Sequence, residues 1–193
     1  MSFTKFILPI VAILVIVSAY VLQNGQINTP TSSPIISNVE AAPKALPGVP
    51  INLKIPSVGV DAAIESIGLT DGAVGVPKGP STTAWFNLGP KPGEMGSAII
   101  TGHFGPWRNG AHSVFDNLSK IKIGDKVYVR DNNGQTRSFS VIDIKTYSGD
   151  AVVPEIFNKS DAVYLNIITC SGDWLANQKT YTQRLVVFTK ADS

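Results

Sequence analysis

Hydrophobic and polar residues alternate along short runs between residues 51 and 193, and Gly, Pro, Asn or Asp bounds most of these runs. Such alternation is typical of β-strands with one buried and one exposed face. Lys126–Arg130 (KVYVR) alternates cleanly. The turn residues Asp131–Gly134 (DNNG) join it to a second alternating run, which predicts a β-hairpin. No segment after residue 50 keeps the apolar spacing of an amphipathic helix over three turns.

The strands predicted from these runs are Ile51–Ile55, Val60–Ile67, Ser97–Gly102, Lys126–Arg130, Gln135–Tyr147, Val163–Thr169 and Arg184–Lys190. Short helical turns are expected near Pro80–Ala84, Ser113–Leu118 and Pro154–Phe157. Many short strands without a long helix predict an all-β domain, either a barrel or a sandwich.

An uncharged apolar run of 17 residues occupies positions 6–22 (FILPIVAILVIVSAYVL). As a helix it would be about 25 Å long, which is just enough to cross the hydrocarbon core of a bilayer. Lys5 precedes the run, and a positive flank favours a cytoplasmic N-terminus. A cleaved signal peptide is the alternative, but no small residue stands at the required position close behind the run. We therefore expect residues 1–22 to form a cytoplasmic tip and a transmembrane anchor.

Residues 23–50 are rich in Pro, Gly, Ser, Thr, Asn and Gln and show no periodicity, which predicts a flexible spacer. The remaining residues, 51–193, suit one folded domain of ordinary size. Together these assignments predict a single-pass protein of the cell membrane whose folded domain lies outside the cytoplasm.

Charge and composition narrow the function further. The 16 Lys and Arg residues nearly balance 14 Asp and Glu residues, so a nucleic-acid partner is not expected. One cysteine excludes a disulfide framework and a metal site made of thiols alone. The chain contains only two histidines, so a His-rich metal centre is not expected either.

The lone cysteine, Cys170, is the first candidate for chemistry. In an exported chain an unpaired thiol is either buried and inert or the reactive group itself. Cys170 ends the β-type run Asn166–Cys170, where a rigid element meets a loop. A nucleophilic thiol needs a proton partner, and His103 also stands at the exit of a predicted strand. Arg184, at the start of the last predicted strand, could stabilise an oxyanion.

Aromatic residues divide into two groups. Trp85, Phe115, Phe139 and Phe157 are expected in the core. Trp107 and Trp174 follow His103 and Cys170 in predicted loops, so we expect them to rim a peptide-binding groove.

Several flanking motifs accompany these candidate residues in a fixed order. They are Val76-Pro77, Trp85-Phe86, Pro92–Ser97 (PGEMGS), Thr101-Gly102-His103, Val114–Leu118 (VFDNL), Gly124–Val127 (GDKV), Ile167–Cys170 (IITC) and Gln183–Val187 (QRLVV). As an ordered set over residues 51–190 they resemble a sortase, a membrane-anchored cysteine transpeptidase of bacterial, mostly Gram-positive, cell surfaces. Where the family usually has TLxTC, this chain reads NIITC.

The resemblance implies a closed eight-stranded β-barrel and assigns roles to the candidate residues. Cys170 would attack the threonine carbonyl of an LPxTG-like sorting signal and form a thioacyl enzyme. His103 would protonate the leaving amine and later deprotonate the incoming one, and Arg184 would stabilise the oxyanion. Thr169 would contribute to the oxyanion site or contact the substrate. The partners implied are the sorting-signal peptide of a secreted protein and an amine of the cell wall or of a pilin.

Some sortases bind calcium through a cluster of acidic residues. The acidic residues of this chain are scattered, so calcium stays open but is not predicted, and no other cofactor or metal is expected. Two alternatives to a sortase also stay open. One is an exported cysteine transpeptidase that acts on peptidoglycan cross-links, and the other is a non-catalytic tethered β-domain that binds wall components.

Overall fold

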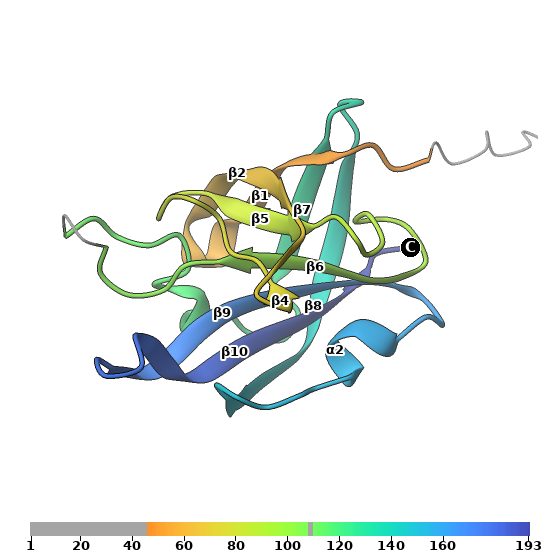
Figure 1. Ribbon diagram of the computed structural model, residues 1–193. Helices are drawn as coiled ribbons and strands as arrows, with labels where there is room; N and C mark the ends of the chain where they lie inside the picture. Colours follow the sequence, from red (N-terminus) through yellow and green to blue (C-terminus); the bar gives the residue numbers. More distant parts are fainter. Residues whose placement is uncertain (1–45, 108–109) are drawn as a thin grey trace, which may run out of the picture. The chain divides into compact units, whose positions relative to one another are not determined.

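The computed structural model describes residues 46–107 and 110–193 (Figure 1). Eight strands form a closed barrel in the order β1-β2-β5-β6-β9-β10-β8-β7, which confirms the predicted all-β barrel. The barrel strands are β1 (Pro50–Ile55), β2 (Val60–Ile67), β5 (Thr83–Phe86), β6 (Gly96–Gly102), β7 (Lys126–Asp131), β8 (Thr136–Ser148), β9 (Val163–Leu175) and β10 (Thr180–Ala191).

The predicted anchor, residues 1–22, lies outside the described residues, as does most of the predicted spacer. In the two described ranges, no helix has both the length and the apolar character that crossing a bilayer requires.

Two barrel contacts are parallel, β2 with β5 and β6 with β9, and the others are antiparallel. Parallel neighbours need a crossover connection. The first crossover contains the small hairpin of β3 (Leu69–Thr70) and β4 (Ala73–Val74). The second contains β7, β8 and the short helix α2 (Glu155–Asn158). Both crossovers matter for the site because they cover the outer face of β6 and β9.

The largest differences from the sequence prediction concern short or extended strands. The turn expected near Pro80–Ala84 is present at residues 80–81 but not as a helix, and Thr83 and Ala84 belong to β5, whose residues Thr83, Ala84 and Trp85 are buried. The other two helical turns are present, as turn residues leading into the 3-10 helix Leu118–Lys120 and as α2. β9 and β10 continue beyond their predicted ends, and in Figure 1 their hairpin projects from the left side of the barrel.

The core has two parts, one on each side of the sheet. The barrel interior holds most of the buried side chains, including Trp85, Phe115 and Phe139 as predicted. A smaller cluster on the outer face joins Ile99, Val186 and Phe188 to Ile156 of α2. Phe157 was predicted to be buried, but it is 45% exposed. In the short helix α2 it is the neighbouring Ile156 that turns toward the sheet, so the prediction for Phe157 was wrong.

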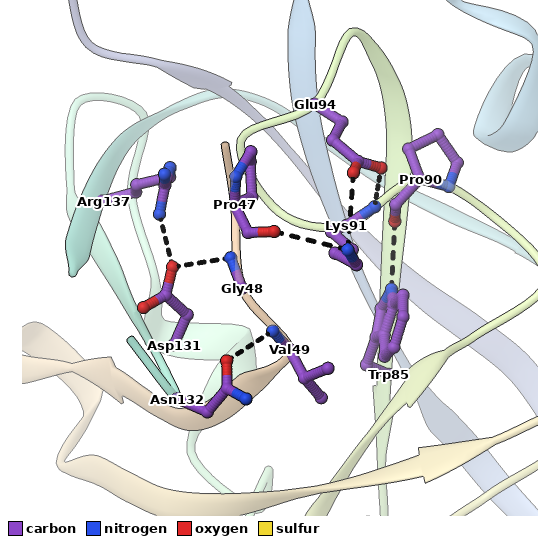
Figure 2. A network of polar contacts seen from close by, with 10 residues as sticks. All are labelled: Pro47, Gly48, Val49, Trp85, Pro90, Lys91, Glu94, Asp131, Asn132 and Arg137. Atoms are coloured by element: carbon purple, nitrogen blue, oxygen red, sulfur yellow. Dashed lines mark hydrogen bonds and ion pairs between the residues drawn. The ribbon is translucent and has the colours of Figure 1, made fainter. Parts of the chain in front are cut away.

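Hydrogen bonds tie the start of the described chain to the β7–β8 turn (Figure 2). The backbone N–H of Gly48 donates to Asp131 at 2.9 Å, and that of Val49 donates to Asn132 at 2.9 Å. Arg137 forms an ion pair with Asp131 at 2.8 Å, and both side chains are largely buried. These contacts fasten residues 48–49 to the barrel directly ahead of β1.

Candidate active site

Cys170 and Arg184 are directly opposite each other on the antiparallel strands β9 and β10. Side chains of directly opposed residues lie on the same face of a sheet, close to each other. The register of the two strands therefore places these two predicted site residues side by side. Cys170 does not end its strand, as the sequence suggested, and Arg184 does not begin one. Both lie inside their strands because the pairing continues to Leu175 and Thr180.

A β-bulge explains why the strand continues past Cys170. Gly172 has a φ of 76°, in the left-handed region, and together with Asp173 it stands opposite the single residue Thr182. This arrangement is a bulge that requires glycine, and the hairpin resumes with Trp174 opposite Tyr181. The sequence Ser171-Gly172-Asp173 resembles a loop, although its glycine marks a kink in a continuing strand.

His103 follows β6, the other neighbour of β9. Thr101 is opposite Ile168 in this parallel pair, and both residues line the same pocket on the outer face. His103 and Cys170 come two residues after Thr101 and Ile168, respectively. Because side chains of a strand alternate between its two faces, His103 and Cys170 are on that outer face as well. The ring nitrogen Nε2 of His103 lies 2.7 Å from the carbonyl oxygen of Pro77. Because a carbonyl can only accept, Nε2 carries a hydrogen and Nδ1 of the neutral ring is the acceptor.

A pocket of about 250 Å³ opens beside Cys170 on the outer face of the barrel. Its floor is formed by β6, β9 and β10 through Thr101, Ile168 and Val186. One wall comes from residues 73–76 and the other from the segment between β8 and α2, residues 147–157. Cys170, Thr169 and Arg184 line the pocket, so three of the predicted site residues meet there.

Opposing influences act on the thiol of Cys170. Burial raises its pKa, and the positive charge of Arg184 lowers it by a smaller amount, so the pKa lies above the usual value of 9.0. The sulfur is therefore a neutral thiol at pH 7, and a base has to remove its proton for attack. The position of His103 suits this task.

Arg184 is held in place by the β9–β10 hairpin. Its guanidinium donates to the carbonyl oxygens of Tyr181 and Gln183 at 3.0 and 2.9 Å and to the hydroxyl of Thr180 at 3.1 Å. None of these three acceptors is an acid, so these contacts do not neutralise the positive charge of Arg184. An oriented, uncompensated cation next to a nucleophile can stabilise an oxyanion.

Thr169 has a structural contact as well as a place in the pocket lining. Its hydroxyl donates to the carbonyl oxygen of Gly102 at 2.9 Å, and the residue is only 3% exposed. This bond ties β9 to β6 one residue before both Cys170 and His103. The hydroxyl hydrogen of Thr169 is therefore used in this bond. Thr169 thus positions the two segments that carry Cys170 and His103.

The two tryptophans expected to rim the groove each pack against another aromatic ring. The Trp107 ring packs against His103 with 4.8 Å between centroids. Trp174 is 53% exposed and packs against Tyr181 with centroids 5.1 Å apart, on β9 instead of in a loop. Neither lines the pocket, so a substrate contact by Trp107 or Trp174 stays a prediction.

Other residues at the site were not recognised from sequence. Tyr181 packs edge-on against Phe104, next to His103, with 5.3 Å between ring centroids. Tyr147 lines the pocket from the end of β8. Neither residue has a local signal that distinguishes it from a core or surface tyrosine. Pro77 did have one, since Val76-Pro77 was among the matching motifs, but it had no assigned role.

No group of three or more His, Cys, Asp and Glu side chains in the described parts of the chain is arranged to hold a metal ion. The site is thus described by Cys170, His103 and Arg184 with their protein partners.

Comparisons with solved structures agree with this fold. Sortase C1 of Streptococcus agalactiae, in a complex with MTSET, is 21% identical with a TM-score of 0.58, covering 74% of this chain and 68% of that one. A Clostridium perfringens sortase D5 transpeptidase is 20% identical with a TM-score of 0.55, covering 76% and 79%. Sortase A from Corynebacterium diphtheriae is 22% identical with a TM-score of 0.57, covering 78% and 63%. At these identities the likeness establishes the fold.

A comparison with curated protein sequences finds no significant match. The family model of the sortase domain, however, matches residues 53–192. This range includes all eight barrel strands except the first three residues of β1. This chain belongs to the sortase family.

Proposed function

We propose that this protein is a cysteine transpeptidase that cleaves an LPxTG-like sorting signal after its threonine and transfers the secreted protein to an amine. The observation that carries the proposal is the Cys170–Arg184 pair, opposed on neighbouring strands at the edge of a pocket and flanked by His103. The amine acceptor would belong to the cell wall or to a pilin.

The first half-reaction forms a thioester. His103 takes the proton of Cys170 as the sulfur attacks the threonine carbonyl carbon, and Arg184 faces the negative charge that develops on the oxygen. The tetrahedral intermediate collapses, the C–N bond breaks, and the protonated His103 gives its proton to the leaving amine. The threonine carbonyl is then bound to the Cys170 sulfur.

The second half-reaction reverses the roles. An incoming amine attacks the thioester carbon and His103 accepts its proton. The C–S bond then breaks, and His103 gives that proton to the Cys170 sulfur, which returns both residues to their starting states. A new amide bond replaces the old one, so no oxidant, reductant or cofactor is consumed. Water as the second nucleophile would instead release the free acid.

The pocket walls support an apolar peptide segment as substrate. Val76 and Phe157 line the pocket and are 50% and 45% exposed, so their apolar surface is available at its mouth. Leu and Pro of a sorting signal would cover this surface and leave the threonine carbonyl near Cys170. We further propose that residues 6–22 anchor the chain in the cell membrane with the barrel on the outer side.

The test uses the full chain in detergent, a fluorescent LPxTG-containing peptide and a small amine. We expect transfer of the peptide fragment to the amine, no product with Cys170→Ala, and a thioester adduct of the expected mass when the amine is omitted. Turnover by Cys170→Ala at the wild-type rate would contradict the proposal. Product from peptidoglycan fragments but not from the peptide would favour the alternative wall transpeptidase.

A further inference from the structure

The segment Gly75–Pro77 lies between the pocket and His103, and both of its outer carbonyls accept hydrogen bonds from the end of β6. The hydroxyl of Thr101 donates to Gly75 O at 2.9 Å, and Nε2 of His103 donates to Pro77 O at 2.7 Å. Two donors that are two residues apart, Thr101 at the end of β6 and His103 directly after it, thus bind acceptors two residues apart on this segment. We call residues 75–77 the strap.

The central residue of the strap faces the pocket. Gly75 and Pro77 are buried, whereas Val76 between them is 50% exposed and lines the pocket wall. A peptide in the pocket would therefore touch Val76, whose two neighbours are bonded to Thr101 and His103. The strap forms a connection one residue long between the substrate site and the candidate catalytic imidazole.

The strap is fixed by its own sequence and by its flanks. Proline fixes φ at residue 77 and restricts Val76 to extended conformations. The N–H of Gly75 donates to Gly68 O at 3.1 Å, and that of Lys78 donates to the carboxylate of Glu65 at 3.3 Å. At Gly75 a Cβ would come within 2.7 Å of the Ile67 side chain and 3.1 Å of the Gly68 carbonyl oxygen, so a larger residue would force one of them to shift. These restraints hold the Pro77 carbonyl at one place.

We infer that the strap is a positioning element for His103: Pro77 O holds the imidazole in the Nε2–H tautomer, and peptide contact at Val76 is transmitted to that ring. Tautomer control follows from the geometry alone. The coupling to peptide rests on the proposed function. This positioning role explains the Val76-Pro77 motif physically, because the restricted backbone of proline makes the Pro77 carbonyl a rigid acceptor. Nδ1 is then the nitrogen left to exchange protons with Cys170 and the amines.

The first experiment measures the tautomer directly, without activity. Two-bond ¹⁵N–¹H spectra of the imidazoles are recorded for the full chain in detergent micelles, with the 97% exposed side chain of His112 as internal reference. We expect a single Nε2–H tautomer for neutral His103 in the wild type and a mixture in Pro77→Gly. Pro90→Gly is the matched control, because Pro90 O also accepts a side-chain hydrogen bond, from Trp85 at 3.0 Å, near the opposite end of β6.

An Nδ1–H tautomer in the wild type would overturn the inference, and so would an unchanged His103 spectrum in Pro77→Gly or an equal change in Pro90→Gly. If Pro77→Gly does not fold, Thr101→Val is the test variant instead. Thr101→Ser, which keeps the hydroxyl, is then its control. Removing the Thr101 bond is then expected to broaden or shift the His103 signals, and an unchanged spectrum counts against the strap.

The second experiment tests the coupling. With the LPxTG peptide, Pro77→Gly is expected to lower kcat about tenfold with little change in KM, since a misplaced imidazole affects chemistry more than binding. In a Cys170→Ala background, peptide should shift the His103 signals, and Val76→Gly should abolish that shift. A shift that survives Val76→Gly overturns the coupling. If the wild type does not process the peptide at all, the proposed function fails, while the tautomer comparison still decides the positioning role.

Discussion

At the scale of single residues, the proposed chemistry depends on the balance between burial and a nearby charge at Cys170. Burial raises the pKa of the thiol, and Arg184 partly offsets this effect. The same guanidinium is oriented by three neutral oxygen acceptors, so its charge stays available to the sulfur and to an oxyanion. In the proposed mechanism Arg184 has two electrostatic roles, and its effect on the thiol can be measured without substrate.

We predict that Arg184→Ala slows alkylation of Cys170 by a small thiol reagent. Removal of the cation raises the thiol pKa further, so the thiolate fraction at pH 8 falls and the rate drops several-fold. The measurement is the alkylation rate from pH 7 to 10.5, whose midpoint in the wild type should lie above 9.0.

Arg184→Lys keeps a charge and should retain part of the wild-type rate. Lys190→Ala, which removes a cation six residues further along β10, should have no effect. An Arg184→Ala profile that coincides with the wild-type profile would show that the arginine does not influence the thiol.

At the scale of elements, a polar contact holds the pocket wall formed by residues 147–157. Glu155 of α2 accepts hydrogen bonds from the hydroxyl of Tyr147 and from Lys145, both on β8. Burial, together with the contact to Glu155, raises the pKa of Tyr147 to about 12, so the phenol keeps its hydrogen and remains a donor at physiological pH. The wall therefore depends on an ionised Glu155.

We predict that Glu155→Gln raises KM for the sorting peptide and leaves kcat nearly unchanged, because it loosens the wall without touching Cys170 or His103. Hydrogen exchange of residues 149–158 should accelerate in the same variant. Glu94→Gln is the matched control, since Glu94 also pairs with a lysine, Lys91, but lies outside the pocket. Equal exchange rates in wild type and Glu155→Gln would contradict a fastening role.

At the scale of the whole molecule, Asp131 links the beginning of the barrel to the β7–β8 hairpin (Figure 2). Burial alone would raise the pKa of Asp131. Hydrogen bonds from the N–H groups of Gly48, Gln135 and Asn133 and from Arg137 outweigh burial and lower the pKa below the usual 3.8. A lowered pKa means that the carboxylate stabilises the fold above pH 3.8 and that this stabilisation is lost as the pH falls through the folded-state value.

We predict that Asp131→Asn lowers the free energy of unfolding at pH 7 by about 3 kcal/mol, because the largely buried ion pair with Arg137 is broken. Activity at a permissive temperature should persist, since the pocket does not include this turn. Denaturant unfolding from pH 2.5 to 7 should show a weaker pH dependence in the variant than in the wild type.

Asp61→Asn is the control for this prediction. Asp61 pairs with Lys54 on the surface, and both side chains are more than half exposed, at 58% and 55%. Such a pair contributes little to stability. A loss of stability in Asp131→Asn that is no larger than in Asp61→Asn would show that the buried network is not needed.

The alternation of hydrophobic residues was sufficient to predict the all-β class, the β7–β8 hairpin and most strand positions. It failed at β5, where four mostly buried residues (TAWF) follow a proline-containing turn and show no period of two. It also ended β9 too early, because the glycine of the bulge at residue 172 resembles a loop signal. Both errors concern places where contacts distant in sequence outweigh local preference.

By itself, the sequence determined which side chains could carry the chemistry. A single cysteine and two histidines left few combinations, and the order of motifs singled out Cys170, His103 and Arg184. Only the tertiary structure decided that Arg184 is opposite Cys170, that Pro77 O binds the His103 ring, and that the pocket lies on the outer face of β6, β9 and β10. The physical reason is that residue types follow from the chain, whereas strand register and barrel closure follow from non-local packing and hydrogen bonding.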